Sequence, residues 1–217
     1  MSLIDVRNLR YRYPDGTDAL RGVDFQMRDG ECVALLGPNG SGKTTFALLL
    51  AGLLKGEGSV TVNGKLGLVF QDADNQLFMP TVLEDVCYGP LNQGCSPAQA
   101  RARAEQVLEQ TGMSHTAAKA PYHLSAGEKR LVAIAGVLAM QPDILVFDEP
   151  TTSLDPPAER NLVRLLKELP QAKLLVTHDV AFARTLAARA VFFDQGRVAA
   201  DGPLADIVTR FDWGSPI

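Results

Sequence analysis

A glycine-rich segment constrains the fold of this chain more than any other feature. Residues 31–36 form a short apolar run, and Lys43 to Leu54 carry a helical pattern that ends near Gly56. Between them stands the segment Gly37-Pro38-Asn39-Gly40-Ser41-Gly42-Lys43-Thr44. Its glycines let the backbone curl so that successive N–H groups face one point, beside the positive end of the helix. The pattern is that of a phosphate-binding loop and predicts an α/β core.

The bulk properties agree with a single globular domain. The chain has 217 residues, of which 46% are hydrophobic and 21% charged. Its net charge of -4 gives no basic footprint, which argues against a nucleic-acid partner. The three cysteines lack metal-ligand spacing and indicate reduced thiols. Residues 1–5 show no signal sequence, and the apolar run 131–140 is about half a membrane span, so we expect any membrane role to come through a partner.

The order of elements indicates an α/β core with two additions. Alternating segments from Leu3 to Gly30 predict antiparallel strands. Residues 75–140 are rich in helix signals, including an N-cap and proline at Ser96-Pro97 and a stop at Gly112. We expect one domain, 1–217, with an inserted helical subdomain at about 75–140. The other expected elements are strands 59–64, 65–70, 144–147 and 173–177, a helix over 157–169, and a hairpin of 191–194 with 197–201.

The residue types at two further positions predict phosphate chemistry. Asp148 follows four apolar residues, so it should lie at the carboxyl end of a buried strand, where open α/β sheets bind ligands. There it can join the Thr44 hydroxyl at Mg²⁺, while Lys43 reaches the β- and γ-phosphates. Glu149, the next residue, is the candidate general base for the attacking water.

A second anion site is predicted at the segment Leu124-Ser125-Ala126-Gly127-Glu128. A serine and free amides at the start of a helix over 128–140 suit an anion. The alternative is an ordinary N-cap, because Ser125 with Glu128 also fits a capping box. Since the chain already has its own phosphate loop, a second site makes sense for a γ-phosphate supplied by another copy.

Together these three segments resemble the ATP-binding-cassette (ABC) ATPases, over about residues 3–205. The resemblance implies a P-loop NTPase core with a mainly parallel sheet, an N-terminal antiparallel β subdomain and an inserted helical subdomain. It implies ATP and Mg²⁺ as ligands. It places the loop Gly37, Pro38, Asn39, Gly40, Ser41, Gly42, Lys43 and Thr44, together with Thr45, on the nucleotide of one half-site, and Ser125, Ala126, Gly127 and Glu128 on the nucleotide of a second, head-to-tail subunit.

The same resemblance implies roles for single residues. Gln71 corresponds to the glutamine that reaches the metal and the water, and His178 to the switch histidine at the γ-phosphate. Tyr13 matches the aromatic that stacks on adenine, with Tyr11 as its rival. Ser153-Leu154-Asp155 matches the loop that crosses the dimer seam. His115 and His123 lack such a setting, and we expect no role for them. Ala126 and Glu128 depart from the family pattern, which most often has Gly and Gln there.

Within the ABC ATPases, the chain is most similar to the energy-coupling-factor branch. Residues 71–78, 81–86, 89–90, 133–140 and 201–203 carry this likeness. It implies a peripheral subunit at the cytoplasmic face of the plasma membrane, working as a homodimer with integral coupling and substrate-binding membrane subunits in cobalt, nickel or vitamin import. Leu77-Phe78-Met79 would then line a docking groove, or else belong to the core.

Other functions remain as alternatives. An ATPase of another ABC transporter class would share every motif. A DNA-repair or chromosome ABC ATPase would interrupt the domain with coiled coils or zinc modules, and no such heptads are present. A translation factor would need two cassettes, and a kinase would not need Ser125–Glu128.

Overall fold

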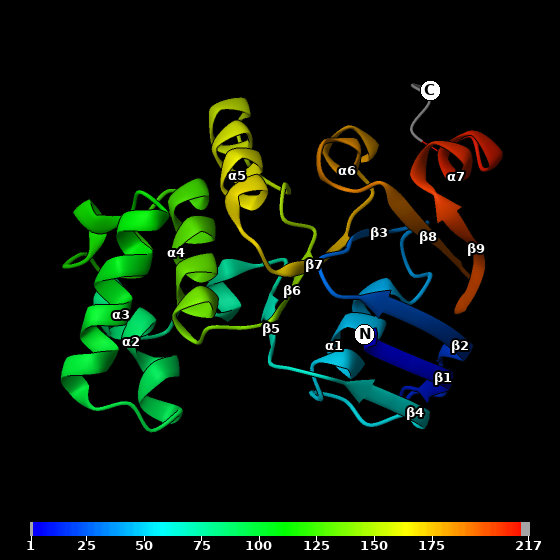
Figure 1. Ribbon diagram of the computed structural model, residues 1–217, viewed down its shortest axis with the longest axis horizontal. Coiled ribbons are helices and arrows are strands. Elements are labelled where there is room, and N and C mark those ends of the chain that lie inside the picture. Colours follow the sequence, from blue (N-terminus) through cyan, green and yellow to red (C-terminus); the bar gives the residue numbers. More distant parts are fainter. Residues whose placement is uncertain (1, 214–217) are drawn as a thin grey trace. The chain divides into compact units, whose positions relative to one another are not determined.

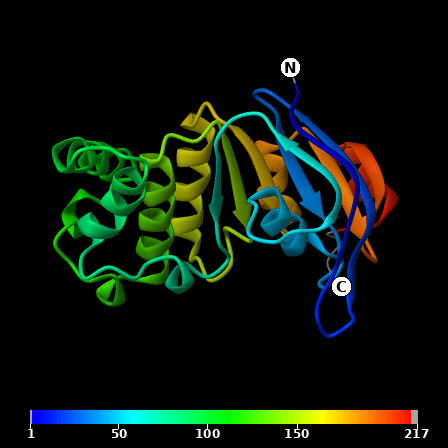
Figure 2. The same cartoon turned by 90° about the horizontal axis from the view of Figure 1, so that it is seen from below.

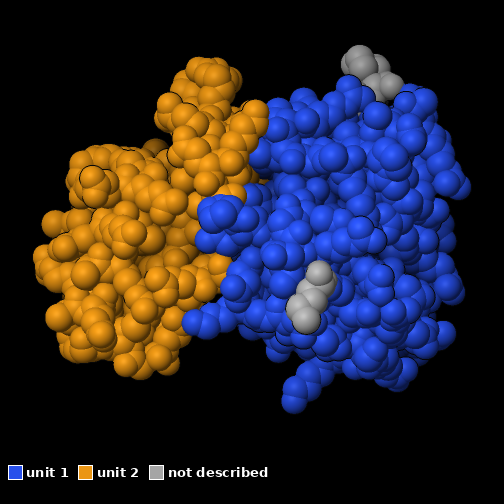
Figure 3. Space-filling view, viewed as in Figure 1, with its two compact units in different colours: residues 1–68, 143–149, 170–217 blue, residues 69–142, 150–169 orange. Residues whose placement is uncertain are grey.

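The computed structural model describes residues 2–213, which divide into two compact units. The first comprises residues 2–68, 143–149 and 170–213, and the second comprises 69–142 and 150–169 (Figures 1 and 3). None of the helices within residues 2–213 has both the length and the apolar character that a membrane span requires.

The first unit contains a small antiparallel sheet in the order β2-β1-β4. Strands β1 and β2 alternate over much of their length between buried and exposed side chains, as expected where one face of a sheet meets the core. Figure 1 shows these strands side by side in blue and blue-green. The strands are β1 (Ser2–Arg12), β2 (Asp18–Arg28) and β4 (Glu57–Val62).

The six-stranded sheet has the order β5-β6-β7-β3-β8-β9. Strand β3 pairs in parallel with β7 and β8, β6 pairs in parallel with β7, and the last pair, β8 with β9, is antiparallel. Strands β6 and β7 are buried along their whole length, which explains their continuous apolar runs. The strands are β3 (Cys32–Leu36), β5 (Leu66–Val69), β6 (Ile144–Asp148), β7 (Ala172–Val176), β8 (Arg189–Asp194) and β9 (Arg197–Pro203).

Helices cover this sheet within the first unit. Helix α1 packs its Phe46 ring against Phe25 of β2 and Phe193 of β8, with ring centroids 5.4 and 5.3 Å apart. Helices α6 and α7 enclose a second apolar cluster with β3 and β8. The helices are α1 (Lys43–Leu50), α6 (Val180–Leu186) and α7 (Leu204–Arg210). The sequence predicted that α1 continues to Leu54. It ends at Leu50, because Gly52 takes a left-handed backbone (φ 71°) that terminates the helix.

The second unit is built from helices. Helices α2, α3 and α4 pack on one another, as both Figures 1 and 2 show, and α4 also contacts α5. Ser96 caps α3 and Pro97 is its first residue, as the sequence predicted. The elements are η1 (Ala73–Asn75), α2 (Val82–Asn92), α3 (Pro97–Gln110), η2 (Ser114–Thr116), η3 (Pro121–His123), α4 (Ala126–Ala139) and α5 (Pro156–Glu168).

Candidate functional site

Three neighbouring parallel strands end at one edge of the larger sheet, and each end carries a predicted site residue. The register pairs Leu35 of β3 with Val176 of β7, and Val176 with Asp148 of β6. The three strands therefore end at the same level of the sheet. They lead into the phosphate loop, into His178 and into the pair Asp148-Glu149. This is the edge where open α/β sheets bind ligands.

The glycines of the phosphate loop are required by its geometry. A Cβ on Gly37 (φ 135°) would lie 2.1 Å from the Phe193 carbonyl oxygen, and one on Gly42 (φ 104°) would lie 2.5 Å from that of Ala19. Apart from its two chain neighbours, nothing in the described part of the chain lies within 4 Å of a Cβ built on Gly40, so that side of the loop is open. The Ser41 hydroxyl is buried and has no hydrogen-bond partner among residues 2–213. An open cradle with an unsatisfied donor suits phosphate oxygens.

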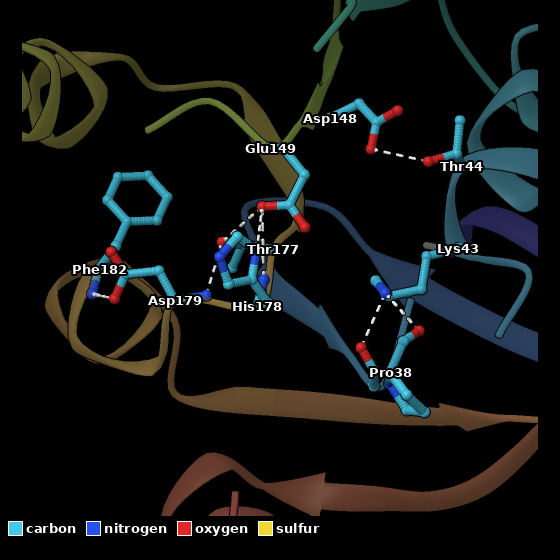
Figure 4. A network of polar contacts seen from close by, with 10 residues as sticks. Pro38, Lys43, Thr44, Asp148, Glu149, Thr177, His178, Asp179 and Phe182 are labelled. Atoms are coloured by element: carbon cyan, nitrogen blue, oxygen red, sulfur yellow. Dashed lines mark hydrogen bonds and ion pairs between the residues drawn. The ribbon is translucent and has the colours of Figure 1, made fainter. Parts of the chain in front are cut away.

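Lys43 lies buried inside the loop, with 6% of its surface exposed. Its Nζ donates to the carbonyl oxygens of Gly37 and Pro38 at 2.8 and 3.0 Å (Figure 4). Burial lowers the pKa of this ammonium, and the nearby charges of Glu149 and Asp148 oppose the shift. These two carbonyl oxygens thus hold the lysine at the loop. A phosphate can take their place and form a stronger, charge-assisted bond with the ammonium.

Thr44 and Asp148 form a pair of oxygen donors next to the loop. The Thr44 hydroxyl donates to Asp148 Oδ1 at 3.2 Å, and Asp148 is buried (Figure 4). Within residues 2–213 there is no group of three or more His, Cys, Asp or Glu side chains placed to hold a metal. One hydroxyl and one carboxylate fit Mg²⁺, which binds proteins through one or two oxygens and takes its other ligands from phosphates and water.

Glu149 and His178 lie in hydrogen-bond contact. The Nδ1 atom of His178 is 2.9 Å from Oε2 of Glu149, and the Thr177 hydroxyl donates to the same oxygen at 3.4 Å. Glu149 is buried and has a left-handed backbone (φ 45°), an unusual conformation for a residue with a side chain. Figure 4 shows all three side chains converging. Sequence reasoning missed Thr177, whose only signal is its position at the end of an apolar strand.

Tyr13 and Tyr11 take different positions. The Tyr13 hydroxyl lies 3.0 Å from the Thr45 hydroxyl, at the start of α1. The Tyr11 ring meets Tyr13 edge-on at 5.0 Å and packs against the main core cluster of the first unit. This arrangement places Tyr13, rather than Tyr11, beside the phosphate loop, while its contact with adenine stays a prediction.

The turn between β8 and β9 contacts the phosphate loop and stabilises it. Gly196 donates its N–H to the Ser41 carbonyl at 3.0 Å and accepts from the Arg21 N–H at 2.8 Å. A Cβ on Gly196 (φ 76°) would lie 2.7 Å from the Ala19 carbonyl oxygen. Residues 195–196, predicted as a hairpin turn, thus also hold the loop in place.

The second predicted anion site lies in the second unit, at the start of α4. The helix begins at Ala126, two residues earlier than predicted, with Ser125 as its N-cap. Glu128 N–H donates to Ser125 Oγ at 3.3 Å, and Ser125 N–H donates to Glu128 Oε2 at 2.8 Å. This is the capping box that the sequence left as an alternative. The bonds from Ser125 lower the pKa of Glu128, and His115 Nε2 lies 3.5 Å from its other oxygen.

The remaining predicted residues also belong to the second unit. Asp155 caps α5, accepting from the Ala158 N–H at 2.9 Å. A Cβ on Gly127 would lie 3.0 Å from that of Ala158, so the starts of α4 and α5 are close together. Gln71 follows β5, and its main-chain carbonyl accepts from Arg130 of α4. Sequence reasoning missed Arg130, because a basic residue on a helix gives no sign of what it contacts.

Comparison with known proteins agrees with this fold and this phosphate loop. The family model described as "ABC transporter" matches residues 20–152. The chain therefore belongs to the ABC transporter family, as its ATP-binding, ATP-hydrolysing subunit.

Individual relatives sharpen the comparison. A Geobacter sulfurreducens protein, named as an ABC transporter ATP-binding protein, is 48% identical over 94% of this chain and 88% of its own length. The energy-coupling factor transporter ATP-binding protein EcfA of Methanothermobacter thermautotrophicus is 44% identical over 94% of this chain and 72% of its own.

Two solved structures share the ABC ATPase fold predicted from the sequence. The structure of CbiO1 from Clostridium perfringens, part of the ABC transporter complex CbiONQ, has a TM-score of 0.84 at 34% identity, covering 97% of this chain and 92% of its own. A dimeric bacterial ABC transporter cassette has a TM-score of 0.82 at 30% identity, covering 93% of this chain and 98% of its own.

Proposed function

We propose that this chain is the ATPase subunit of an energy-coupling-factor-type importer, which powers uptake of cobalt, nickel or a vitamin through membrane partners. The similarity to EcfA and to CbiO1 supports this branch. The protein would then lie at the cytoplasmic face of the membrane, bound to integral coupling and substrate-binding subunits. We treat residues 1–217 as one ABC ATPase domain with a helical subdomain at about 75–140.

The chemistry rests on one observation, the 2.9 Å contact between Glu149 and His178. Glu149 accepts a proton from the attacking water. The oxygen of this water bonds to the γ-phosphorus, and the bond between this phosphorus and the β–γ bridging oxygen breaks. His178 and Thr177 hold the carboxylate in place. Lys43 binds the β- and γ-phosphates, and Tyr13 stacks on adenine. Thr44, Asp148 and Gln71 would hold Mg²⁺, which would supply positive charge to the phosphate oxygens.

The second half-site would act in trans. Ser125, Ala126 and Gly127 of one copy bind the γ-phosphate held by the loop of another copy, and Asp155 lies at the seam between them. A cassette similar to this chain forms dimers, and in a second structure that cassette is bound to ADP and phosphate. ATP would close a head-to-tail homodimer and hydrolysis would open it, so that the motion drives the membrane partners.

An apolar surface of the second unit favours the proposal that a membrane partner binds there. Phe78 and Tyr88 are 64% and 42% exposed, and their rings meet edge-on at 5.0 Å. They line a hollow of about 160 Å³ together with Leu77, Val86 and Met140, among others. An exposed apolar hollow of this kind suits an amphipathic helix from a partner. We assign it to the coupling helix of the membrane subunit.

The catalytic assignment is tested with Glu149→Gln. The variant should bind ATP with unchanged affinity, lose hydrolysis by a factor of about 10²–10⁴, and accumulate as an ATP-bound dimer. Wild-type hydrolysis by this variant would refute the role of Glu149. For the wild type, activity that rises with the square of protein concentration at low concentration would support the dimer.

The transport assignment is tested by co-purification from membranes of the source organism. The wild-type chain should bring down integral subunits whose identity reveals the cargo. Phe78→Asp should lose them, whereas Leu53→Asp, a change at another exposed apolar residue, should retain them. Retention by both variants would exclude this hollow as the docking site, and stimulation of the ATPase by DNA would favour the repair alternative.

A further inference from the structure

Residues 70–79 form a segment that is attached to its own unit by side chains. We call it the glutamine segment, because it begins beside Gln71. Four side chains tie it to helices α2 and α4, namely Arg130, Lys129, Gln76 and Asp85. It contains no helix longer than the three residues of η1, so these contacts define its conformation.

Arg130 makes the most specific of these contacts. Its Nη1 donates to the Phe70 carbonyl and its Nη2 to the Gln71 carbonyl. The residue is only 4% exposed. A guanidinium presents its donors in one rigid plane, so it can bridge two acceptors at once, which the single ammonium of lysine cannot do with the same geometry. Two successive carbonyls that face one guanidinium fix the backbone between them, and with it the origin of the Gln71 side chain.

Gln76 joins the same part of the segment to the same helix. Its Oε1 accepts from the Phe70 N–H at 3.2 Å, and its Nε2 donates to the Ala133 carbonyl at 3.4 Å. Arg130 and Ala133 are three residues apart, so they lie on one face of α4. The N–H of Phe70 and the carbonyls of Phe70 and Gln71 are therefore all held by one helix face or by a side chain bonded to it.

The far end of the segment is held from α2. Both oxygens of Asp85 accept main-chain bonds, from the N–H of Phe78 and of Met79, at 3.1 Å each. Asp85 is buried, and desolvation raises the pKa of its carboxyl. The Lys129–Asp74 ion pair, at 2.6 Å, joins the middle of the segment to α4. The segment is thus fastened at its start, middle and end.

We propose that Arg130 is a positioning residue for ATP hydrolysis, which fixes Gln71 to α4 so that Gln71 and the Ser125 helix start move as one body. The proposal rests on the role of Gln71 at Mg²⁺ and the attacking water that is proposed above. In this proposal Arg130 acts through the backbone that carries Gln71, whose carbonyl it binds. Any displacement of α4 is then transmitted to Gln71.

The test variant is Arg130→Lys, which keeps the charge and loses the two-pronged contact. Arg101→Lys is the matched control, since Arg101 is an exposed arginine of α3 whose Nε donates to Glu105 at 2.8 Å. Because a displacement of about 1 Å can cost up to about 10²-fold, Arg130→Lys should lower kcat by about 10- to 100-fold. KM for ATP should change less than twofold, and the Mg²⁺ concentration for half-maximal activity should rise. Arg101→Lys should match the wild type in all three.

A double-variant comparison separates positioning from general damage to the fold. A residue that acts through Gln71 has nothing left to position in Gln71→Ala, so adding Arg130→Lys to that variant should not lower kcat further. An equal loss in both backgrounds would overturn the proposal. If the Tm of Arg130→Lys lies far below that of the wild type, Gln76→Met is the test variant instead. It removes the contacts of Gln76 with Phe70 and with Ala133 of α4, and it leaves Arg130 in place.

Amide hydrogen exchange tests the clamp without any activity measurement. Exchange of residues 70–79 should quicken in Arg130→Lys and remain unchanged in Arg101→Lys. Unchanged exchange in Arg130→Lys would also overturn the proposal. If instead Gln71→Ala alone leaves kcat unchanged while exchange responds as expected, the clamp stands and the role given to Gln71 under the proposed function fails.

Discussion

We propose that two helix starts in this protein bind phosphate, and they are built in opposite ways. Helix α1 begins after Gly42, and no side chain of the described residues caps it. Helix α4 begins after Ser125, and a complete capping box with Glu128 closes it. An uncapped helix start leaves N–H donors and a partial positive charge for a ligand. A capped start has already given some of that capacity to its own carboxylate.

The difference teaches how each site would acquire an anion. At α1 the glycine cradle, the buried Lys43 and the Ser41 hydroxyl, which has no hydrogen-bond partner within residues 2–213, all come from one chain. At α4 the Glu128 carboxylate is an anion already present, so a phosphate must either displace it or share the helix end with it. We therefore expect the first site to bind ATP strongly and the second to respond only when another copy presents the phosphate.

The largest effect should come from adding one methyl group at the first site. Gly37→Ala places a Cβ 2.1 Å from the Phe193 carbonyl oxygen on a left-handed backbone. A strained backbone of this kind costs about 1–3 kcal/mol and the clash displaces the loop, so ATP binding measured by calorimetry should weaken by up to about 100-fold. Gly127→Ala in α4 is the matched change, with a helical backbone and a tight 3.0 Å contact. It should leave ATP binding to the monomer unchanged, and equal losses in the two variants would break the comparison.

A smaller effect is expected from Ser125→Ala. Loss of the N-cap should destabilise the protein by about 1 kcal/mol, seen as a modest drop in Tm. Loss of a hydroxyl bond to a charged phosphate costs about 1.5–3 kcal/mol, so ATP-dependent dimerisation of the Glu149→Gln background should weaken by about 10- to 100-fold. Analytical ultracentrifugation with and without ATP measures this. A lower Tm with unchanged dimerisation would leave Ser125 as an ordinary N-cap.

Removing the charge of Glu128 should change the second site in the other direction. Glu128→Gln keeps the shape of the capping side chain and removes an anion from the helix start. Charges at exposed helix ends contribute about 0.3–1 kcal/mol, so ATP-dependent dimerisation should strengthen by about two- to fivefold. Low salt should enlarge the gain, because salt screens the repulsion. Weaker dimerisation would mean that the carboxylate itself contributes to binding.

The smallest effect concerns acid. Because the pKa of Glu128 is lowered in the folded state, its cap stabilises the protein above the ordinary glutamate pKa and is lost as pH falls through the lowered value. The difference in Tm between the wild type and Glu128→Ala should thus be full near neutral pH and shrink below about pH 4. Thermal melts from pH 7 to 3 measure it, and a constant difference would rule out the ionised cap.

The sequence predicted the first site more completely than the second. Glycine spacing and apolar runs fixed the strands, the phosphate loop and the position of Asp148, because these depend on local backbone rules. The predicted end of α1 was four residues too late, since Gly52 rather than Gly56 terminates the helix. The contacts of Arg130 with carbonyls about sixty residues away, and of Asp85 with the N–H groups of Phe78 and Met79, carry no periodic signal. Such contacts depend on tertiary packing.

The support of the phosphate loop by the β8–β9 turn has a consequence for biosynthesis. The loop ends at Thr44, yet two of its neighbours, Phe193 and Gly196, are synthesised much later, after the whole helical unit. A ribosome-bound chain that stops before this turn lacks the atoms that shape the cradle. We therefore expect ATP to be captured only after β8 and β9 have been synthesised and have folded against the loop.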